Sequence, residues 1–231
     1  LCTLLRNDVA NNTFTFLNYI STHKSKFDST MTKGFMVCNS AEFQRQVELQ
    51  FSDEAITKNT DYVKVVAYTN MAVSAWNKFI RETIIKDSEK SVITKNDLIT
   101  SYITLVNEFK ETIIRNSEDY IVRDIANYTH PKYDIKGFMV KFQAVHGGQV
   151  TSPLFVLDHR DAYSIKRYCQ ICNDLIEQAK NANKQVRAAK WKKYFEFRES
   201  CLILINFVKN DGTVLHYRNL DYGFSVTAHK S

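Results

Sequence analysis

The segment Val65–Arg81, with the sequence VVAYTNMAVSAWNKFIR, decides how we interpret the fold of this chain. The segment starts within an apolar run, Val63–Tyr68, which predicts a buried strand. The polar residues Thr69 and Asn70 follow this strand, at the point where an amphipathic helix is predicted to begin. Earlier in the chain, Gly34–Cys38 predicts another buried strand, which is also followed by a helical pattern. Strands and helices that alternate at this spacing predict a parallel sheet covered by helices.

The pattern changes near residue 90, and residues 92–158 have the short alternating runs that are typical of antiparallel strands. Gly137–Val145 and Leu154–Leu157, for example, flank a turn that contains Gly147 and Gly148. About five such strands within this stretch predict a small β-barrel. The expected class is therefore α/β, in which a partial parallel sheet with helices is interrupted by a barrel.

A helical segment follows at about 160–200, and it carries the basic character of the chain. Residues 160–198 contain ten Lys or Arg and four Asp or Glu, an excess of +6 that equals the formal net charge of all 231 residues. An alternating stretch near 213–226 then returns the chain to strand. We expect one domain from 1–90 and 213–231, and an insertion at 91–212 with its barrel at 92–158 and its helices at 160–200.

The composition favours a soluble, cytoplasmic protein. Five Cys without clustered spacing argue against a disulfide framework and fit a reducing compartment. Cys169 and Cys172 lie in a helical pattern, where buried cysteines are more common than a zinc site. No apolar run approaches the roughly 20 residues that cross a bilayer, so we expect no membrane association. Because the chain does not begin with Met, we expect it to be part of a longer protein.

The last twelve residues, LDYGFSVTAHKS at 220–231, carry the strongest motif. A strand here would deliver hydroxyls and a cation to the edge of a sheet, where such groups can hold phosphate oxygens. The segment resembles motif V of the superfamily 1 DNA helicases of the RecD-like and Dda-like branch, commonly written Y-A-x-T-x-H-K-S-Q-G. The resemblance implies contacts to DNA for Thr227, His229, Lys230 and Ser231. The alternative is a terminal strand with an exposed polar tail.

Two further segments resemble the second motor domain of the same helicases. Val65–Arg81 is similar to the family's strand followed by Thr-Asn, which implies that Thr69 and Asn70 contact DNA; alternatively, Asn70 only caps the helix. Leu4–Asn7 resembles motif IV, which implies that Arg6 is an arginine finger to the γ-phosphate of ATP. An arginine near a helix start is also commonly solvated or ion-paired.

The region between these motifs resembles the accessory domain 2B of the Dda-like helicases, which contains a Src-homology-3-like barrel. Lys95–Ile99 is similar to the Gly-Asp opening of that domain, with Asn96 in place of the glycine, which leaves the geometry of the turn open. Trp191–Phe195 is similar to its Trp-containing segment. These aromatic residues could bind nucleic acid, although the pattern favours packing against the barrel.

The resemblance implies a fragment of an ATP-dependent DNA helicase that moves 5′ to 3′ on single-stranded DNA and unwinds duplexes, as in DNA repair or recombination. ATP and Mg²⁺ would bind between this domain and a first motor domain, because the chain has no phosphate-binding G-x-x-x-x-G-K-[ST] loop. The fragment alone is therefore not expected to hydrolyse ATP. Two alternatives stay open: the α-subunit of exodeoxyribonuclease V, working with nuclease subunits, and a non-catalytic nucleic-acid-binding module.

Overall fold

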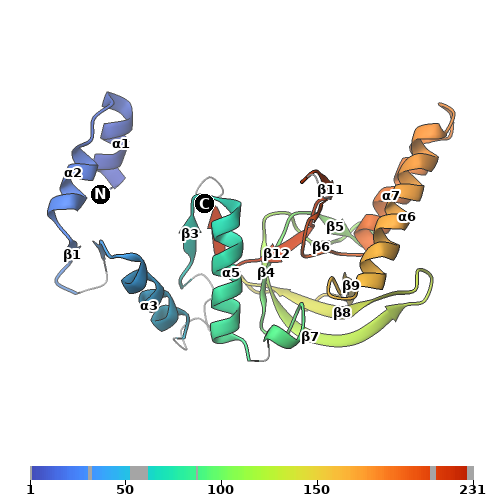
Figure 1. The fold of residues 1–231 in the computed structure, drawn as a ribbon, viewed down its shortest axis with the longest axis horizontal. Helices are drawn as coiled ribbons and strands as arrows, with labels where there is room; N and C mark the ends of the chain where they lie inside the picture. The colour runs from blue at the N-terminus through green and yellow to red at the C-terminus, as the bar shows by residue number, and fades with distance from the viewer. Residues whose placement is uncertain (1, 31–32, 53–61, 87, 209–211, 228–231) are drawn as a thin grey trace. The chain divides into compact units, whose positions relative to one another are not determined.

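A computed structural model of the chain describes residues 2–30, 33–52, 62–86, 88–208 and 212–227. The chain divides into two compact units, Leu1–Gln50 and Phe51–Ser231 (Figure 1). Both helices and strands are present, and the strands pair in parallel as well as in antiparallel fashion. The expected mixture of helices with parallel and antiparallel strands is confirmed.

The first unit begins with two helices, α1 (Cys2–Asn11) and α2 (Thr15–Thr22). The carboxylate of Asp8 in α1 joins them, since it accepts hydrogen bonds from the Thr13 hydroxyl at 2.6 Å, from the Thr15 hydroxyl and from the Phe16 amide at 2.6 Å. Burial opposes the ionised carboxylate, but these hydrogen bonds outweigh it and lower the pKa of Asp8 to about 2.

The strand predicted at Gly34–Cys38 forms, but in a different environment from the one expected. It is β2 (Gly34–Met36), it pairs antiparallel with β1 (Ser25–Phe27), and five of the six residues of this hairpin are exposed. The prediction that it is a buried strand of the parallel sheet was wrong. The sequence between the two strands is short, so pairing with a neighbour along the chain satisfies its backbone locally.

Helix α3 (Ser40–Phe51) follows this hairpin and begins with a capping box. The Glu42 amide donates to Oδ1 of Asn39 at 2.9 Å, and the Asn39 amide donates to Oε2 of Glu42 at 3.0 Å. Two amides that lack partners within the helix are thereby satisfied.

In the second unit, β3 (Val65–Ala67) pairs in parallel with β13 (Ser225–Thr227), and Val66 lies opposite Val226. The sequence predicts that the strand at 224–227 shares a sheet with the strand at 63–68, because the barrel interrupts the parallel sheet, and this pairing confirms it. Helix α5 (Asn70–Ile84) follows β3 and packs on this pair (Figure 1).

The larger sheet of the second unit is antiparallel and has the strand order β12-β4-β7-β8-β9. Its core is a cluster of buried aliphatic and aromatic side chains that includes Ile99, Val140 and Phe142. The expected pairing of Gly137–Val145 with Leu154–Leu157 is confirmed, because Phe138 lies opposite Val156. The strands are β4 (Leu98–Ser101), β7 (Asp119–His130), β8 (Ile135–Ala144), β9 (Leu154–Leu157) and β12 (Leu220–Tyr222).

Two details of this sheet differ from the sequence expectation. The runs at 111–114 and 120–125 predict a hairpin connected by the polar residues 116–119, but this hairpin does not form. Instead, β6 (Thr112–Ile114) pairs with β5 (Leu105–Val106), and β7 pairs with β4 and β8. The alternating stretch that begins near residue 213 also does not enter the parallel strand pair directly. Strand β11 (Val214–His216) pairs with β10 (Phe207–Val208), and β12 pairs with β4, so the parallel pair begins only at Ser225.

The helical segment consists of α6 (Ala162–Asn181) and α7 (Arg187–Ser200), which pack against each other. The half of this hairpin nearer the sheet buries a second core around Tyr168 and Phe197, whose ring centroids are 5.3 Å apart. Cys172 is buried in this core, and Cys169 packs against it. His216 is also buried there, and burial lowers its pKa to about 4, so the ring is neutral near pH 7.

Candidate nucleic-acid interface

A cavity of about 680 Å³ lies in the second unit, where the parallel strand pair meets the antiparallel sheet. Its walls come from segments that are far apart in sequence: β3, the start of α5, the turn before β7, and the chain from Arg218 to Thr227. Polar side chains predominate among the thirteen lining residues, which are Lys64, Val66, Asn70, Val73, Thr100, Tyr102, Ser117, Asp119, Arg218, Tyr222, Ser225, Val226 and Thr227.

Thr69 and Asn70 stand between β3 and α5, where the backbone turns from strand to helix. Thr69 is extended, and its hydroxyl accepts from the Ala72 amide at 3.1 Å, so Thr69 is the N-cap of α5. Asn70 is the first helical residue, is exposed and lines the cavity. The alternative that Asn70 caps the helix was therefore wrong, because Thr69 has that role.

Thr227, at the end of β13, lines the same cavity and has a buried hydroxyl without a hydrogen-bond partner among the described residues. Its side chain is 3% exposed. A buried hydroxyl without a partner is unfavourable. Ser225, two residues earlier on the same strand, is in contrast satisfied, since its hydroxyl donates to the Val73 carbonyl at 2.9 Å. An acceptor within the cavity would satisfy Thr227.

Two cations line the cavity, and each is held by a carboxylate. Lys64 forms an ion pair with Asp119, which also accepts from the Thr100 hydroxyl at 2.5 Å. The guanidinium of Arg218 lies 2.6 Å from Asp221.

The ring of Tyr102 supports the second of these cations. The Arg218 guanidinium lies 5.7 Å from the centre of this ring, and the Tyr102 hydroxyl donates to Asp221 at 3.1 Å. Burial, followed by the charge of Asp221, raises the pKa of Tyr102 to about 12, so its hydroxyl remains a donor. The arrangement therefore fixes both cations and several hydroxyl groups around one space.

Asn77 of α5 fixes the strands on which Thr227 and Tyr222 lie. Its Nδ2 donates to the Tyr222 carbonyl at 2.7 Å, and the Ser225 amide donates to its Oδ1 at 2.7 Å. Asn77 is 1% exposed, so both hydrogen bonds are shielded from water. Gly223 lies between these strands, and a Cβ there would be 2.8 Å from the Thr100 hydroxyl, which explains why glycine occupies this position.

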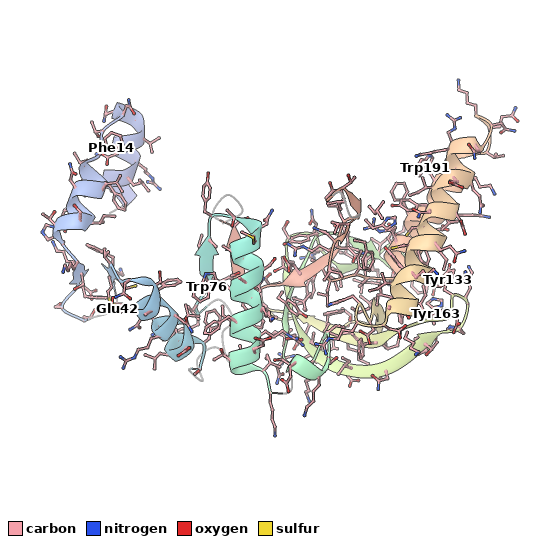
Figure 2. All side chains as sticks on the ribbon, in the orientation of Figure 1. Phe14, Glu42, Trp76, Tyr133, Tyr163 and Trp191 are labelled. Carbon is pink, nitrogen blue, oxygen red and sulfur yellow. The ribbon has the colours of Figure 1, made fainter. Side chains whose placement is uncertain are left out.

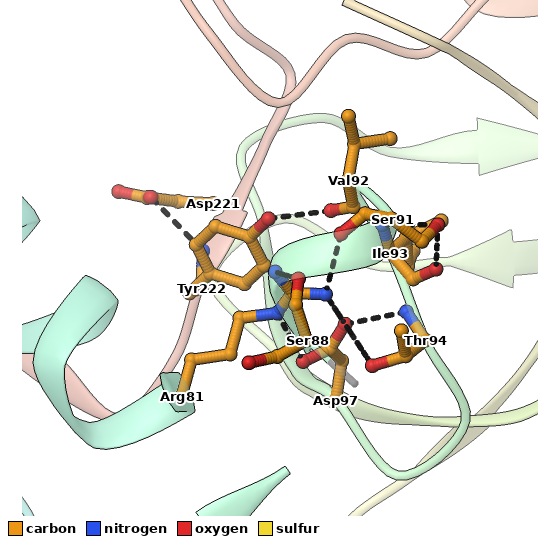
Figure 3. Close-up of polar contacts among 9 residues, drawn as sticks. All are labelled: Arg81, Ser88, Ser91, Val92, Ile93, Thr94, Asp97, Asp221 and Tyr222. Atoms are coloured by element: carbon orange, nitrogen blue, oxygen red, sulfur yellow. Dashed lines mark hydrogen bonds and ion pairs between the residues drawn. The ribbon is translucent and has the colours of Figure 1, made fainter. Parts of the chain in front are cut away.

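A buried ion pair beneath the cavity connects α5 to the antiparallel sheet (Figure 3). Nε of Arg81 donates to Asp97 at 2.7 Å and Nη2 donates to it at 3.0 Å, while Nη1 donates to the carbonyl of Ser88 in the short helix η1 (Ser88–Lys90) at 2.8 Å. The guanidinium also lies 4.9 Å from the centre of the Tyr222 ring. Burial opposes the charge on Arg81, but the hydrogen bond and charge of Asp97 outweigh it and raise the pKa of Arg81.

The turn before Asp97 shows whether its geometry accepts Asn96 in place of the glycine that the helicases have. Asn96 has a φ of 71°, in the left-handed region where glycine is favoured and asparagine is tolerated. The turn geometry is therefore compatible with asparagine. It presents the Asp97 carboxylate to Arg81 and to the Thr94 amide, which donates to it at 2.6 Å.

Only some of the candidate site residues that were selected from the sequence lie at this cavity. Asn70 and Thr227 both line it, and Thr69 adjoins it as the N-cap of α5. Arg6 lies on α1 in the first unit and is exposed. The other three predicted residues, His229, Lys230 and Ser231, lie outside the described residues.

Sequence reasoning missed the two cations of the cavity, Lys64 and Arg218, and the Tyr102 ring that supports Arg218. Lys64 was visible as a charge within an apolar strand, which signals a partner or a functional position. Tyr102 and Arg218 gave no comparable signal, because their contact depends on the pairing of β4 with β12.

Each helix of the described ranges is too short or too polar to span a bilayer. His, Cys, Asp and Glu side chains of these ranges form no group of three or more that could hold a metal ion. Comparison with known proteins found no family model that matches the chain and no curated protein that matches its sequence.

Proposed function

We propose that this chain is the second motor domain, with its 2B-type insertion, of a superfamily 1 DNA helicase of the RecD-like and Dda-like branch. The cavity bounded by Asn70 and Thr227 would hold the backbone of single-stranded DNA. One observation carries the proposal: two residues selected from two separate motifs, 157 positions apart (227 − 70), line the same cavity.

The chemistry of the cavity suits a phosphodiester. The unsatisfied hydroxyl of Thr227 and the amide group of Asn70 are donors for phosphate oxygens, and the free amides at the start of α5 favour an anion. Arg218 would add a planar group of N–H donors, which Asp221 and Tyr102 hold in place. Such contacts position a nucleic acid without reading its sequence, as translocation along any strand requires.

In the complete helicase, ATP and Mg²⁺ would bind between this domain and a first motor domain, as the resemblance implies. Closure around ATP would then shift the grip of the two domains along DNA. Within this proposal, the parallel strand pair with α5 is part of a RecA-like sheet and the antiparallel sheet corresponds to the Src-homology-3-like barrel. Arg6 would face the γ-phosphate of ATP.

The substitution Thr227→Val tests the proposed DNA site. Valine preserves the shape of the side chain and replaces the unsatisfied hydroxyl with a methyl group, so the stability should stay equal or rise by up to about 1 kcal/mol. Affinity for short fluorescent oligo(dT), measured by anisotropy, should fall about tenfold or more, because a hydrogen bond to a charged phosphate contributes about 1.5–3 kcal/mol.

Thr129→Val is the matched control, since Thr129 lies exposed on β7 and does not line the cavity. It should leave oligo(dT) affinity unchanged. Equal affinities of the Thr227→Val variant and the unmodified chain would contradict a phosphate contact at Thr227.

A further inference from the structure

The distal half of the α6–α7 hairpin, residues 178–195, forms a strongly basic projection that we call the hairpin tip. It contains six Lys or Arg and no Asp or Glu. Five of these cations are exposed and Lys190 is half-buried. The six cations are Lys180, Lys184, Arg187, Lys190, Lys192 and Lys193.

The hairpin is anchored at its other end, so the tip projects from a fixed base. The Ser164 hydroxyl, near the start of α6, accepts from the Lys136 amide of β8 at 2.8 Å, and Tyr168 and Cys172 are buried. Figure 2 shows Tyr133 and Tyr163 at this base and Trp191 further along the hairpin. The 20 residues of α6 extend about 30 Å, which carries the tip well away from the sheet.

Few of the charges at the tip are neutralised by the chain itself. Lys192 lies 3.7 Å from Glu196 just outside the tip, whereas the Arg187 guanidinium donates to an uncharged group, the Ala182 carbonyl, at 3.2 and 3.3 Å. Lys180, Lys184 and Lys193 have no ion pair with any carboxylate of the described ranges. Like charges gathered without counter-charges repel one another, so the tip is a surface that a polyanion would stabilise.

The packing of the aromatic side chains at the tip indicates which kind of nucleic acid this surface would bind. Trp191 lies 5.8 Å from Tyr194 and 6.2 Å from Phe195 between ring centres, so the rings pack on one another. A single-strand site presents aromatic faces on which bases can stack, usually within a groove. Projecting cations on two adjacent helices instead suit the regularly spaced phosphates of a duplex backbone.

We infer that the hairpin tip binds the sugar–phosphate backbone of duplex DNA without sequence preference, as a second nucleic-acid surface separate from the cavity. This inference stands on the charge and shape of the hairpin and does not depend on the motor assignment. It would place a duplex against α6 and α7 while a single strand occupies the cavity.

The test reverses the three unpaired cations together, as Lys180→Glu, Lys184→Glu and Lys193→Glu, in the full chain. Binding of a blunt fluorescent DNA duplex, followed by anisotropy, should weaken at least about tenfold. The slope of the logarithm of affinity against the logarithm of salt concentration should become shallower by the equivalent of about three phosphate contacts. Oligo(dT) affinity should be kept. A matched control reverses three exposed lysines away from the tip: Lys86→Glu, Lys95→Glu and Lys166→Glu.

The inference is contradicted if the unmodified chain does not bind the duplex or if both triple variants lose the same affinity. Loss of oligo(dT) binding alone in the tip variant would assign these cations to the single-strand site instead. Tip-dependent binding to phosphatidylserine vesicles, without duplex binding, would make the surface a membrane contact. Urea unfolding of both variants shows whether the fold is retained.

Discussion

Replacing Asp97 with alanine should lower the free energy of unfolding of this chain by about 3–5 kcal/mol. The side chain of Asp97 is fully buried, and that of Arg81 is 7% exposed. Removal of the carboxylate would leave the guanidinium charged in a site closed to water, because an arginine side chain stays protonated at neutral pH even without its partner. Urea unfolding followed by circular dichroism measures the change.

Glu196→Ala is the matched control, because Glu196 pairs with Lys192 on the exposed surface of α7 at 3.7 Å. Its loss should change stability by less than about 1 kcal/mol. Combining Asp97→Ala with Arg81→Met should recover part of the loss, since no unpaired charge then remains buried. Equal effects of Asp97→Ala and Glu196→Ala would show that the ion pair does not connect α5 to the sheet.

The second large effect is expected for Asn77→Ala. The change leaves the Tyr222 carbonyl and the Ser225 amide without the partners that Asn77 provides at 2.7 Å each. Each buried group without its hydrogen bond costs about 1–3 kcal/mol, so the loss of both should lower the free energy of unfolding by about 2–6 kcal/mol. Because β13 would lose the hydrogen bond between its Ser225 amide and α5, oligo(dT) affinity should fall as well.

Asn173→Ala serves as the control for this substitution, since Asn173 is an exposed asparagine within α6. Alanine favours a helix slightly more than asparagine, so stability should change by no more than about 0.5 kcal/mol. If Asn77→Ala proved equally harmless, the two hydrogen bonds could not be what holds the chain between β12 and β13.

The sequence predicted features that depend on local patterns and on the order of motifs. The sequence patterns located β3 and β13, and the change of pattern near residue 90 predicted that the two strands share one sheet, as their parallel pairing confirms. The helix after Asn70 and the pairing of β8 with β9 also followed from periodicity and turn residues. Placement of Asn70 beside Thr227 at one cavity followed from that same pairing.

Contacts that no local pattern or motif marks could not be predicted from the sequence. The spacing of Arg81 and Asp97 carries no pattern that marks an ion pair, and their contact requires a left-handed turn at Asn96. Strand β2 has an apolar composition that suits a buried strand, yet its pairing with β1 leaves it largely exposed. Strand β12 likewise lies close to β13 in sequence but pairs with β4.

Photocrosslinking of oligo(dT) that carries iodouracil, followed by mass spectrometry of the modified peptides, tests the DNA-binding cavity most directly. The proposed site predicts adducts near the cavity, with Tyr102 and Tyr222 as the aromatic acceptors among its lining residues. Adducts should diminish in the Thr227→Val variant and persist in Thr129→Val. Adducts confined to residues 1–50 or to the hairpin tip, with none at the cavity, would contradict the proposal that this cavity holds single-stranded DNA.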